Sequence, residues 1–239
     1  MIIGIAILLL SIVGAALGQT FEVASVKLSS LDANSTSGIK TGHGRLDAHN
    51  VTLKRCIMGA YAVGPHQISG GPDWLDFDRF DILAKADQPV DDDGALMAML
   101  RTLLGERFKL AIRRETRPMT ALVLQVAKNG PKMEKAAPGE SGTNTTNNNT
   151  GVTVDAHHTN MDALARVLAR SLDLPVVNGT GLDAIFNFKL HWVPDNARPA
   201  MEGVSIFTAV QEQLGLRLRS EKTLVEVLVI EHAERPTEN

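Results

Sequence analysis

Apolar and polar positions along the chain follow the same order twice, once over residues 44–127 and again over residues 151–235. Each pass opens with a polar strand that contains the triplet Asp-Ala-His, at 47–49 and at 155–157. A capping residue, an amphipathic helix, a short strand, an aromatic-bearing strand, a second helix and a closing hairpin follow. The pattern predicts an α+β fold, a tandem duplicate of a strand-helix-strand-strand plus helix-hairpin unit, with helices on one face of mainly antiparallel sheets.

Capping and turn residues punctuate the first pass. Thr52 precedes apolar positions at helical spacing, which predicts a helix over residues 53–63. The run Gly70-Gly71-Pro72-Asp73 predicts a tight turn that delivers Trp74. The other elements expected in this pass are strands over 21–28, 66–69 and 79–84, a helix over 95–104, and a hairpin of 108–114 with 119–127.

The second pass uses the same signals in a shorter form. Asn160 and Ser205 take the capping positions ahead of two amphipathic helices. The elements expected here are helices over 161–171 and 206–214, strands over 174–177 and 183–192, and a pairing of 216–218 with 225–230.

Composition divides the chain into four parts. Residues 1–18 form an apolar leader, residues 19–135 hold the first α+β repeat, and residues 151–239 hold the second. Residues 136–150 between the repeats are rich in Asn, Thr and Gly, a low-complexity composition that buries little apolar surface. We therefore expect residues 136–150 to be a linker without regular structure.

The leader predicts export. Residues 1–18 are uncharged and end in Ala16-Leu17-Gly18, a small-x-small sequence typical of a signal-peptidase site. Cleavage near Gly18 would leave a periplasmic or secreted protein. Because no Lys or Arg precedes the apolar run, a retained membrane anchor is the alternative. The sole cysteine, Cys56, excludes an internal disulfide and is expected to be a small buried residue rather than a catalytic thiol.

Charge restricts the class of partner. The formal net charge is −3, and the Lys and Arg residues are dispersed rather than clustered. Nucleic acid and anionic membrane surfaces are therefore poor partners. We expect the partner to be a protein of the cell envelope, and contact with the membrane only through the leader if it is not cleaved.

Catalytic motifs are missing from the sequence. It contains no HExxH helix, no GxSxG elbow, no phosphate loop and no paired CxxC. We accordingly assign no catalytic residue, no metal ligand and no cofactor. His49 and His157 recur at equivalent positions, which favours a structural role shared by both halves. Four aspartates crowd residues 73–81, where surface ion pairing is a simpler interpretation than a cation site because EF-hand spacing is lacking.

One stretch of the first repeat stands out as a candidate partner-binding site. Aromatic residues make up only 4% of the chain, and a rigid turn that presents one of them is a common recognition surface. Trp74 follows such a turn, although the alternative is that it folds back over the first helix as a core residue. The candidate residues are Tyr61, His66, Pro72, Asp73 and Trp74.

Several blocks of the chain resemble a known family. They include QISGGPDWLDFDRFDI, LLGERFKL, DLPVVNGTGL and SIFTAVQEQLGLRL. They look like DUF3738, or TIGR03435, a family of exported proteins from soil bacteria that is abundant in Acidobacteria. The resemblance implies export and a helix-and-strand duplicate, brings no established activity, and marks QISGGPDWL as the first place to look for a site. The order of elements in each half is also similar to the short N-terminal modules of secretins and TonB-dependent receptors, in topology alone.

The sequence thus favours an exported, non-enzymatic binding or protein-interaction module of the bacterial envelope. An exposed edge of an antiparallel sheet recruits a partner strand through main-chain hydrogen bonds and needs no catalytic residue. One alternative is an envelope hydrolase that uses the Asp73–Asp81 cluster together with a histidine such as His66. Another is the soluble sensor domain of a signalling pathway.

Overall fold

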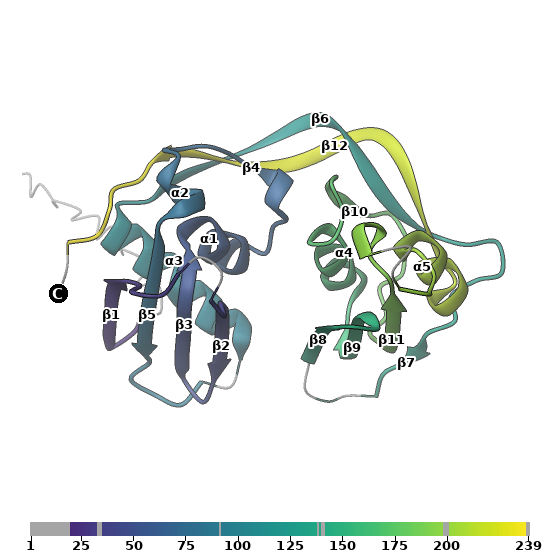
Figure 1. The fold of residues 1–239 in the computed structure, drawn as a ribbon, viewed down its shortest axis with the longest axis horizontal. Coiled ribbons are helices and arrows are strands. Elements are labelled where there is room, and N and C mark those ends of the chain that lie inside the picture. Colours follow the sequence, from purple (N-terminus) through teal and green to yellow (C-terminus); the bar gives the residue numbers. More distant parts are fainter. Residues whose placement is uncertain are drawn as a thin grey trace, which may run out of the picture.

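The structure is a computed structural model that describes residues 20–32, 35–90, 92–137, 139, 142–197 and 201–237. It confirms the α+β fold class, because helices are combined with antiparallel-rich sheets. Figure 1 shows two lobes side by side, spanned by a long two-stranded ribbon. The leader and its expected cleavage site near Gly18 lie outside the described residues. Within these ranges no helix is long and apolar enough to cross a membrane.

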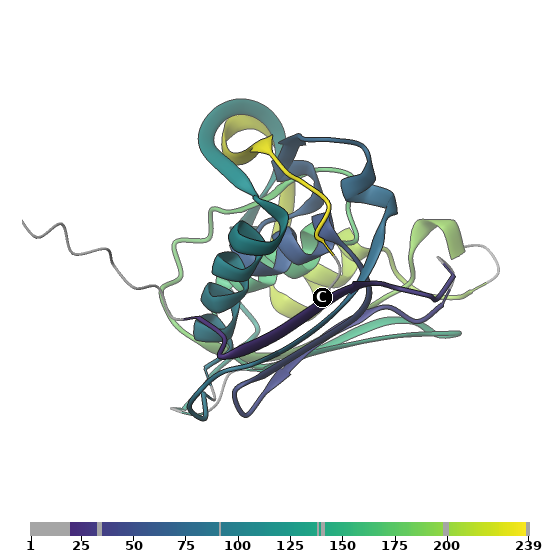
Figure 2. The same ribbon diagram turned by 90° about the vertical axis from the view of Figure 1, so that its left-hand side faces the viewer.

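Lobe 1 is a four-stranded antiparallel sheet in the order β1-β5-β3-β2. Figure 2 shows the sheets below and the helices stacked above them on one face. The elements of lobe 1 are β1 (Val23–Leu28), β2 (Gly38–Gly42), β3 (Arg45–Thr52), α1 (Leu53–Tyr61), the 3-10 turn η1 (Pro65–Gln67), α2 (Trp74–Phe77), β5 (Arg79–Lys85) and α3 (Asp93–Phe108).

Lobe 2 repeats this plan with the strand order β7-β11-β9-β8. Strand β9 takes the place of β3, and β11 takes the place of β5. The elements of lobe 2 are β7 (Glu134–Lys135), β8 (Gly142–Asn148), β9 (Gly151–Thr159), α4 (Met161–Ala169), β11 (Phe186–Trp192), the 3-10 turn η2 (Asp195–Ala197) and α5 (Ile206–Leu214).

The ribbon joins the lobes by exchanging strands between the repeats. Strand β6 (Ala111–Val126) leaves lobe 1 and pairs in parallel with β10 (Val176–Asn178) of lobe 2. Strand β12 (Leu216–His232) leaves lobe 2 and pairs in parallel with β4 (Ile68–Gly70) of lobe 1. Strands β6 and β12 pair with each other, antiparallel, along almost their whole length.

The exchange makes the two predicted hairpins wrong. Residues 108–114 and 119–127 do not fold back on each other, because 111–126 form one continuous strand. Residues 216–218 and 225–230 do not either, because 216–232 form another. The polar residues in the middle of β6 look like a turn in the sequence. In the ribbon this middle segment pairs with β12 instead. Near the start of β6 the side chains also form cross-strand ion pairs, Arg113 with Glu231 at 2.9 Å and Arg114 with Glu226. Cross-strand pairs of this kind stabilise a solvated ribbon.

The predicted helix starts are confirmed by their caps. The side chain of Thr52 accepts a hydrogen bond from the Arg55 N–H at 3.2 Å, and Asn160 accepts one from Ala163 at 2.8 Å. The Ser205 hydroxyl accepts one from the N–H of Thr208 at 3.2 Å. These polar oxygens satisfy amide groups that have no partner within the helix.

The expected linker is ordered in part. Residues 142–148 form β8, which pairs with β9 over its whole length. Every residue of β8 is exposed, so its Asn and Thr side chains remain in water while β9 satisfies one side of its backbone. A polar composition excludes a buried strand and does not exclude a strand at the edge of a sheet. The expectation of a linker without regular structure is therefore wrong for this stretch.

Each lobe has its own core, and each core takes residues from the other repeat. Leu122 and Leu124 of β6 pack in the core of lobe 2, whereas Leu228 and Ile230 of β12 pack in the core of lobe 1. A buried Leu or Ile side chain contributes roughly 1.5–3 kcal/mol of stability. Neither repeat therefore completes its core alone.

The repeats share one irregular feature, a β-bulge that begins at the His of the Asp-Ala-His triplet. In lobe 1 two residues of β3 oppose Asp81, and in lobe 2 two residues of β9 oppose Asn187. The second bulge residue has a positive φ in both lobes, 51° for Asn50 and 49° for His158. Its N–H donates at 2.8 Å to the side chain of Asp81 in lobe 1 and of Asn187 in lobe 2. The repeated triplet thus leads into a repeated backbone structure.

Candidate functional site

The turn that precedes Trp74 holds the exchanged strand in place. Gly70 has a φ of +75°, and a Cβ atom there would lie 2.9 Å from the carbonyl oxygen of Ile230 in β12. Gly71 has a φ of +80°, and a Cβ atom there would collide with Leu75. Two glycines are needed because the backbone must take this conformation and approach β12 closely. The QISGGPDWL block therefore has a structural role.

Trp74 begins α2 and is partly buried against the core of lobe 1. Its ring stacks on Phe108 at a centroid distance of 6.5 Å and meets Phe80 edge-on at 6.3 Å. The guanidinium of Arg235, in the C-terminal tail, lies 5.3 Å from its ring centroid. Trp74 is thus packed against two aromatic rings of the core and also contacts a cation of the same chain.

The other candidate residues lie around the same end of lobe 1. Tyr61 ends α1, and its ring lies 5.8 Å from the guanidinium of Arg101 and 5.9 Å from that of Arg114. Burial raises the pKa of Tyr61, and the two arginines oppose part of that rise. His66 is exposed in η1, Pro72 is half-buried and Asp73 is exposed. Of these residues, Tyr61 and Trp74 pack against the core of lobe 1.

Three of the four aspartates in residues 73–81 each contact a different partner. Asp76 pairs with Lys54 at 2.8 Å, Asp78 pairs with Arg235 at 2.6 Å, and Asp81 accepts the N–H of the bulge residue. The described ranges contain no group of three or more His, Cys, Asp or Glu residues able to hold a metal ion. Ion pairing, the simpler interpretation of the sequence, describes Asp76 and Asp78.

Cys56 is buried in α1, as its place in the helix predicts. Burial raises the pKa of its thiol to about 12, against a smaller opposing effect of the positive charge of Arg55. A thiol held neutral in this way is a core residue and a poor nucleophile.

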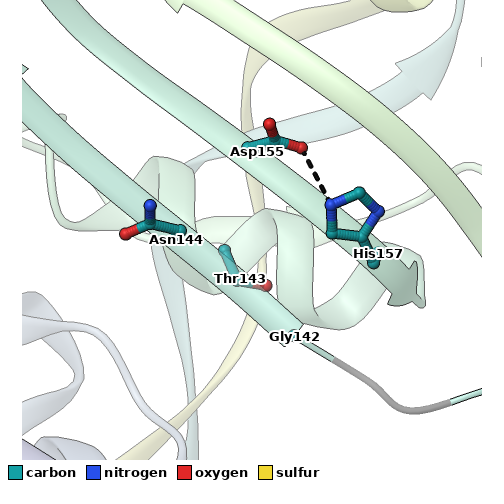
Figure 3. A pocket seen from close by; sticks show the side chains of 5 residues that line it. All are labelled: Gly142, Thr143, Asn144, Asp155 and His157. Carbon is teal, nitrogen blue, oxygen red and sulfur yellow. Dashed lines mark ion pairs between the residues drawn. The ribbon is translucent and has the colours of Figure 1, made fainter.

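A polar hollow lies on the outer face of the lobe 2 sheet. Figure 3 shows Asp155 and His157 side by side on β9, with a distance of 3.2 Å between Oδ1 and Nε2. Both side chains are largely exposed, so the pair is screened by solvent. The hollow has a volume of about 320 Å³ and is lined by Gly142, Thr143, Asn144, Asp155 and His157. The repeated triplet pointed to these two residues, but the sequence did not show that they face solvent.

The outer edge of lobe 1 carries a surface that sequence reasoning missed. Strand β1 is the last strand of its sheet, and in the described part of the chain it pairs on one side only, with β5. Figure 2 shows β1 nearest to the viewer, with its free side turned away from lobe 2. Large apolar side chains are exposed on and beside it, namely Val23 (61% exposed), Leu28 (55%), Leu83 (57%) and Phe77 (75%). We call this surface the β1 edge.

The matching edge of lobe 2 is closed. Its last strand, β7, has two residues, both charged. Next to it the side chain of Gln213 replaces a strand by bonding to the backbone of His191. Its Oε1 accepts the N–H at 2.9 Å, and its Nε2 donates to the carbonyl at 2.8 Å. Short charged edge strands and covered backbones are the usual ways to prevent strand addition. Alternation in the sequence predicts β1 as a strand. Its position as the last strand of the lobe 1 sheet, which leaves one side of its backbone exposed, follows only from the tertiary structure.

Together these features define a two-lobed α+β repeat protein whose repeats exchange strands. The chain belongs to the family described as "Protein of unknown function (DUF3738)", whose model matches residues 54–233, from the start of α1 to the end of β12. This confirms the DUF3738 resemblance seen in the sequence blocks. Neither a curated protein nor a solved structure matches the chain.

Proposed function

We propose that this protein is an exported, non-enzymatic interaction module of the bacterial cell envelope, and that it binds an extended segment of a partner envelope protein along the β1 edge. The observation that carries the proposal is a free strand edge flanked by exposed apolar side chains. The export of the protein rests on the apolar leader and its Ala16-Leu17-Gly18 ending.

Main-chain hydrogen bonds would supply much of the affinity. A strand added beside β1 meets the N–H and C=O groups that do not face β5, and it extends the lobe 1 sheet by one strand. Val23 and Leu83 lie on the outer face of this sheet, whereas Phe77 and Leu28 lie near the end of β1. Alternate side chains of the added strand would cover these apolar groups, which gives the edge a preference for partners with apolar residues at every second position.

Site-specific photo-crosslinking in native envelope fractions tests this proposal. A photoreactive residue at Leu83 is expected to crosslink to one envelope protein, and one at Thr145 of β8, an exposed strand residue of lobe 2, is not. Phe77→Ser is expected to reduce the crosslink at Leu83 at least several-fold, because it removes apolar contact area.

The position of the crosslink on the partner is the deciding measurement. Peptide mapping should place it in one extended segment, with photoreactive residues at Val23 and at Leu83 reaching residues of that same segment. Equal crosslinking from Leu83 and Thr145, or crosslinks scattered over the surface of the partner, would contradict binding at the β1 edge.

A further inference from the structure

After β12 the chain returns to lobe 1 and stays attached to it. Ala233 packs against the core of lobe 1, and the N–H of Glu234 donates to the carbonyl oxygen of Phe108 at 2.7 Å. The next residue, Arg235, reaches across α2.

Arg235 occupies a position built from an aromatic face and a carboxylate. Its guanidinium lies 5.3 Å from the ring centroid of Trp74, and its Nε donates to Oδ2 of Asp78 at 2.6 Å. A planar guanidinium suits both groups, because it stacks on aromatic rings and forms short charge-assisted bonds with carboxylates. A lysine ammonium lacks this planar geometry.

Both halves of this position are also held by contacts that do not involve Arg235. The ring of Trp74 is held by Phe80 and Phe108 beneath it. Asp78 follows α2 directly, and its N–H donates to the carbonyl oxygen of Trp74 at 2.9 Å. A site in which the receiving groups are already ordered loses little entropy on binding.

The contacts of Arg235 with Trp74 and Asp78 are weak enough for another arginine to replace it. Its side chain is 60% exposed and that of Asp78 is 25% exposed. Exposed ion pairs and exposed cation–π contacts are each weak. Release of Arg235 would expose the part of the Trp74 ring that its guanidinium now covers. Strand β12 would stay in place through its pairing with β4.

We propose that Trp74 and Asp78 form a binding site for the arginine side chain of a partner segment, and that Arg235 fills this site in the free protein. The chemistry of the ligand is given by the group already seated there. The site lies beside the end of β1, because the N–H of Ser29 donates to the carbonyl oxygen of Arg79, the residue after Asp78. It does not depend on strand addition at the β1 edge and is tested separately.

The test uses a synthetic peptide with the sequence of residues 231–237, Glu-His-Ala-Glu-Arg-Pro-Thr, and the protein variant Arg235→Ala. Tryptophan fluorescence reports on the site because Trp192, the second tryptophan, is buried. Arg235→Ala is expected to bind the peptide at least about tenfold more tightly than the unaltered protein, in which the tail competes at high effective concentration. Arg217→Ala, a change at an exposed arginine of β12, is the matched control and should behave as the unaltered protein.

Two further variants identify the chemistry. A peptide with Lys in place of Arg is expected to bind several-fold more weakly. The double variant Arg235→Ala/Asp78→Asn should lose binding while its circular dichroism spectrum remains unchanged, and Asp78→Asn avoids removing Trp74 from the core. Equal binding by the unaltered protein and Arg235→Ala, equal binding of the Arg and Lys peptides, or binding that survives Asp78→Asn would each overturn the proposal. Absence of peptide binding to Arg235→Ala would overturn it as well.

Discussion

The two lobes are built on one backbone plan and differ at their rims. Both have a four-stranded sheet, a bulge that begins at the His of Asp-Ala-His, and helices on the same face. Lobe 1 ends in β1, which is six residues long and flanked by apolar side chains, whereas lobe 2 ends in the two charged residues of β7 and in the side chain of Gln213. A duplicated scaffold thus leaves the core elements alike, and the edges are where the copies become free to differ in function.

The bulges show a second difference between the lobes. Asn50 is fully buried, and its Nδ2 donates to the carbonyl oxygens of Asp32 at 3.0 Å and Ser35 at 3.3 Å. His158 is partly exposed, and its ring Nδ1 lies 3.1 Å from the carbonyl oxygen of Ala137. The same backbone geometry therefore anchors a loop in lobe 1 and carries a solvent-facing residue in lobe 2.

The largest expected change in the free energy of unfolding comes from substituting the glycines that contact the exchanged strands. Gly70→Ala should lower the free energy of unfolding by about 3 kcal/mol, because it adds strain at a positive φ to a clash with the Ile230 carbonyl. Gly179→Ala in lobe 2 should cost about 1–2 kcal/mol, since its Cβ would lie 2.5 Å from a side-chain atom, Cγ1 of Val123, at an ordinary φ. Urea denaturation measures both values.

Gly105→Ala is the control for these glycine substitutions. Gly105 lies within α3, and a Cβ atom there would meet nothing within 4 Å. The change should stabilise the protein by about 0.5–1 kcal/mol, because alanine favours the helix. If Gly70→Ala lowered the free energy of unfolding no more than Gly179→Ala does, the prediction would be wrong, and the two ends of the ribbon would be equally sensitive to an added Cβ atom.

An intermediate effect is expected at the bulges, where the two lobes should respond with different magnitudes. Asn50→Gly keeps the positive φ and removes the Nδ2 hydrogen bonds, which should cost about 2 kcal/mol in the free energy of unfolding. His158→Gly relieves a positive φ at a residue with one exposed contact, so it should be neutral within about 0.5 kcal/mol. Denaturant midpoints of the two variants give the comparison.

Asp81→Ala and Asn187→Ala check that the bulges themselves are equivalent. Each change removes the side-chain acceptor of the bulge N–H and should cost about 1–2 kcal/mol. If the cost appeared in one lobe only, the repeated hydrogen bond would not be a common requirement of the fold.

The smallest effect concerns Tyr61, whose two flanking arginines belong to α3 and to the ribbon. Because Tyr61 is the sole tyrosine, an ultraviolet titration of its phenolate should show a pKa above the ordinary value of 10.0, as burial dictates. A raised pKa in the folded state contributes stability below about pH 10 that is lost as the pH rises through the folded-state pKa. Arg101→Gln should raise the pKa further, since it removes a neighbouring positive charge. A pKa at or below 10.0 would contradict the burial of this hydroxyl.

Local signals in the sequence determined the elements of each lobe. Thr52, Asn160 and Ser205 marked three helix starts, since a capping oxygen acts on amides two or three residues away. The repeated triplet indicated that the two halves are built alike, and helical spacing placed Cys56 in the core. These features depend on contacts within a few residues, so a pattern along the chain is enough to reveal them.

Tertiary structure alone decided how the two halves are joined and which surfaces they leave open. Pairing of β6 with β12 brings together residues about a hundred positions apart, and a polar middle segment fits a solvated ribbon as well as a turn. Likewise the sequence of β1 predicts a strand, but its free side exists only because lobe 1 ends there. The position of Arg235 over Trp74 follows from the return of β12 to the other lobe. Long-range register and sheet order carry no local signal, which is why the folded chain was needed to find these sites.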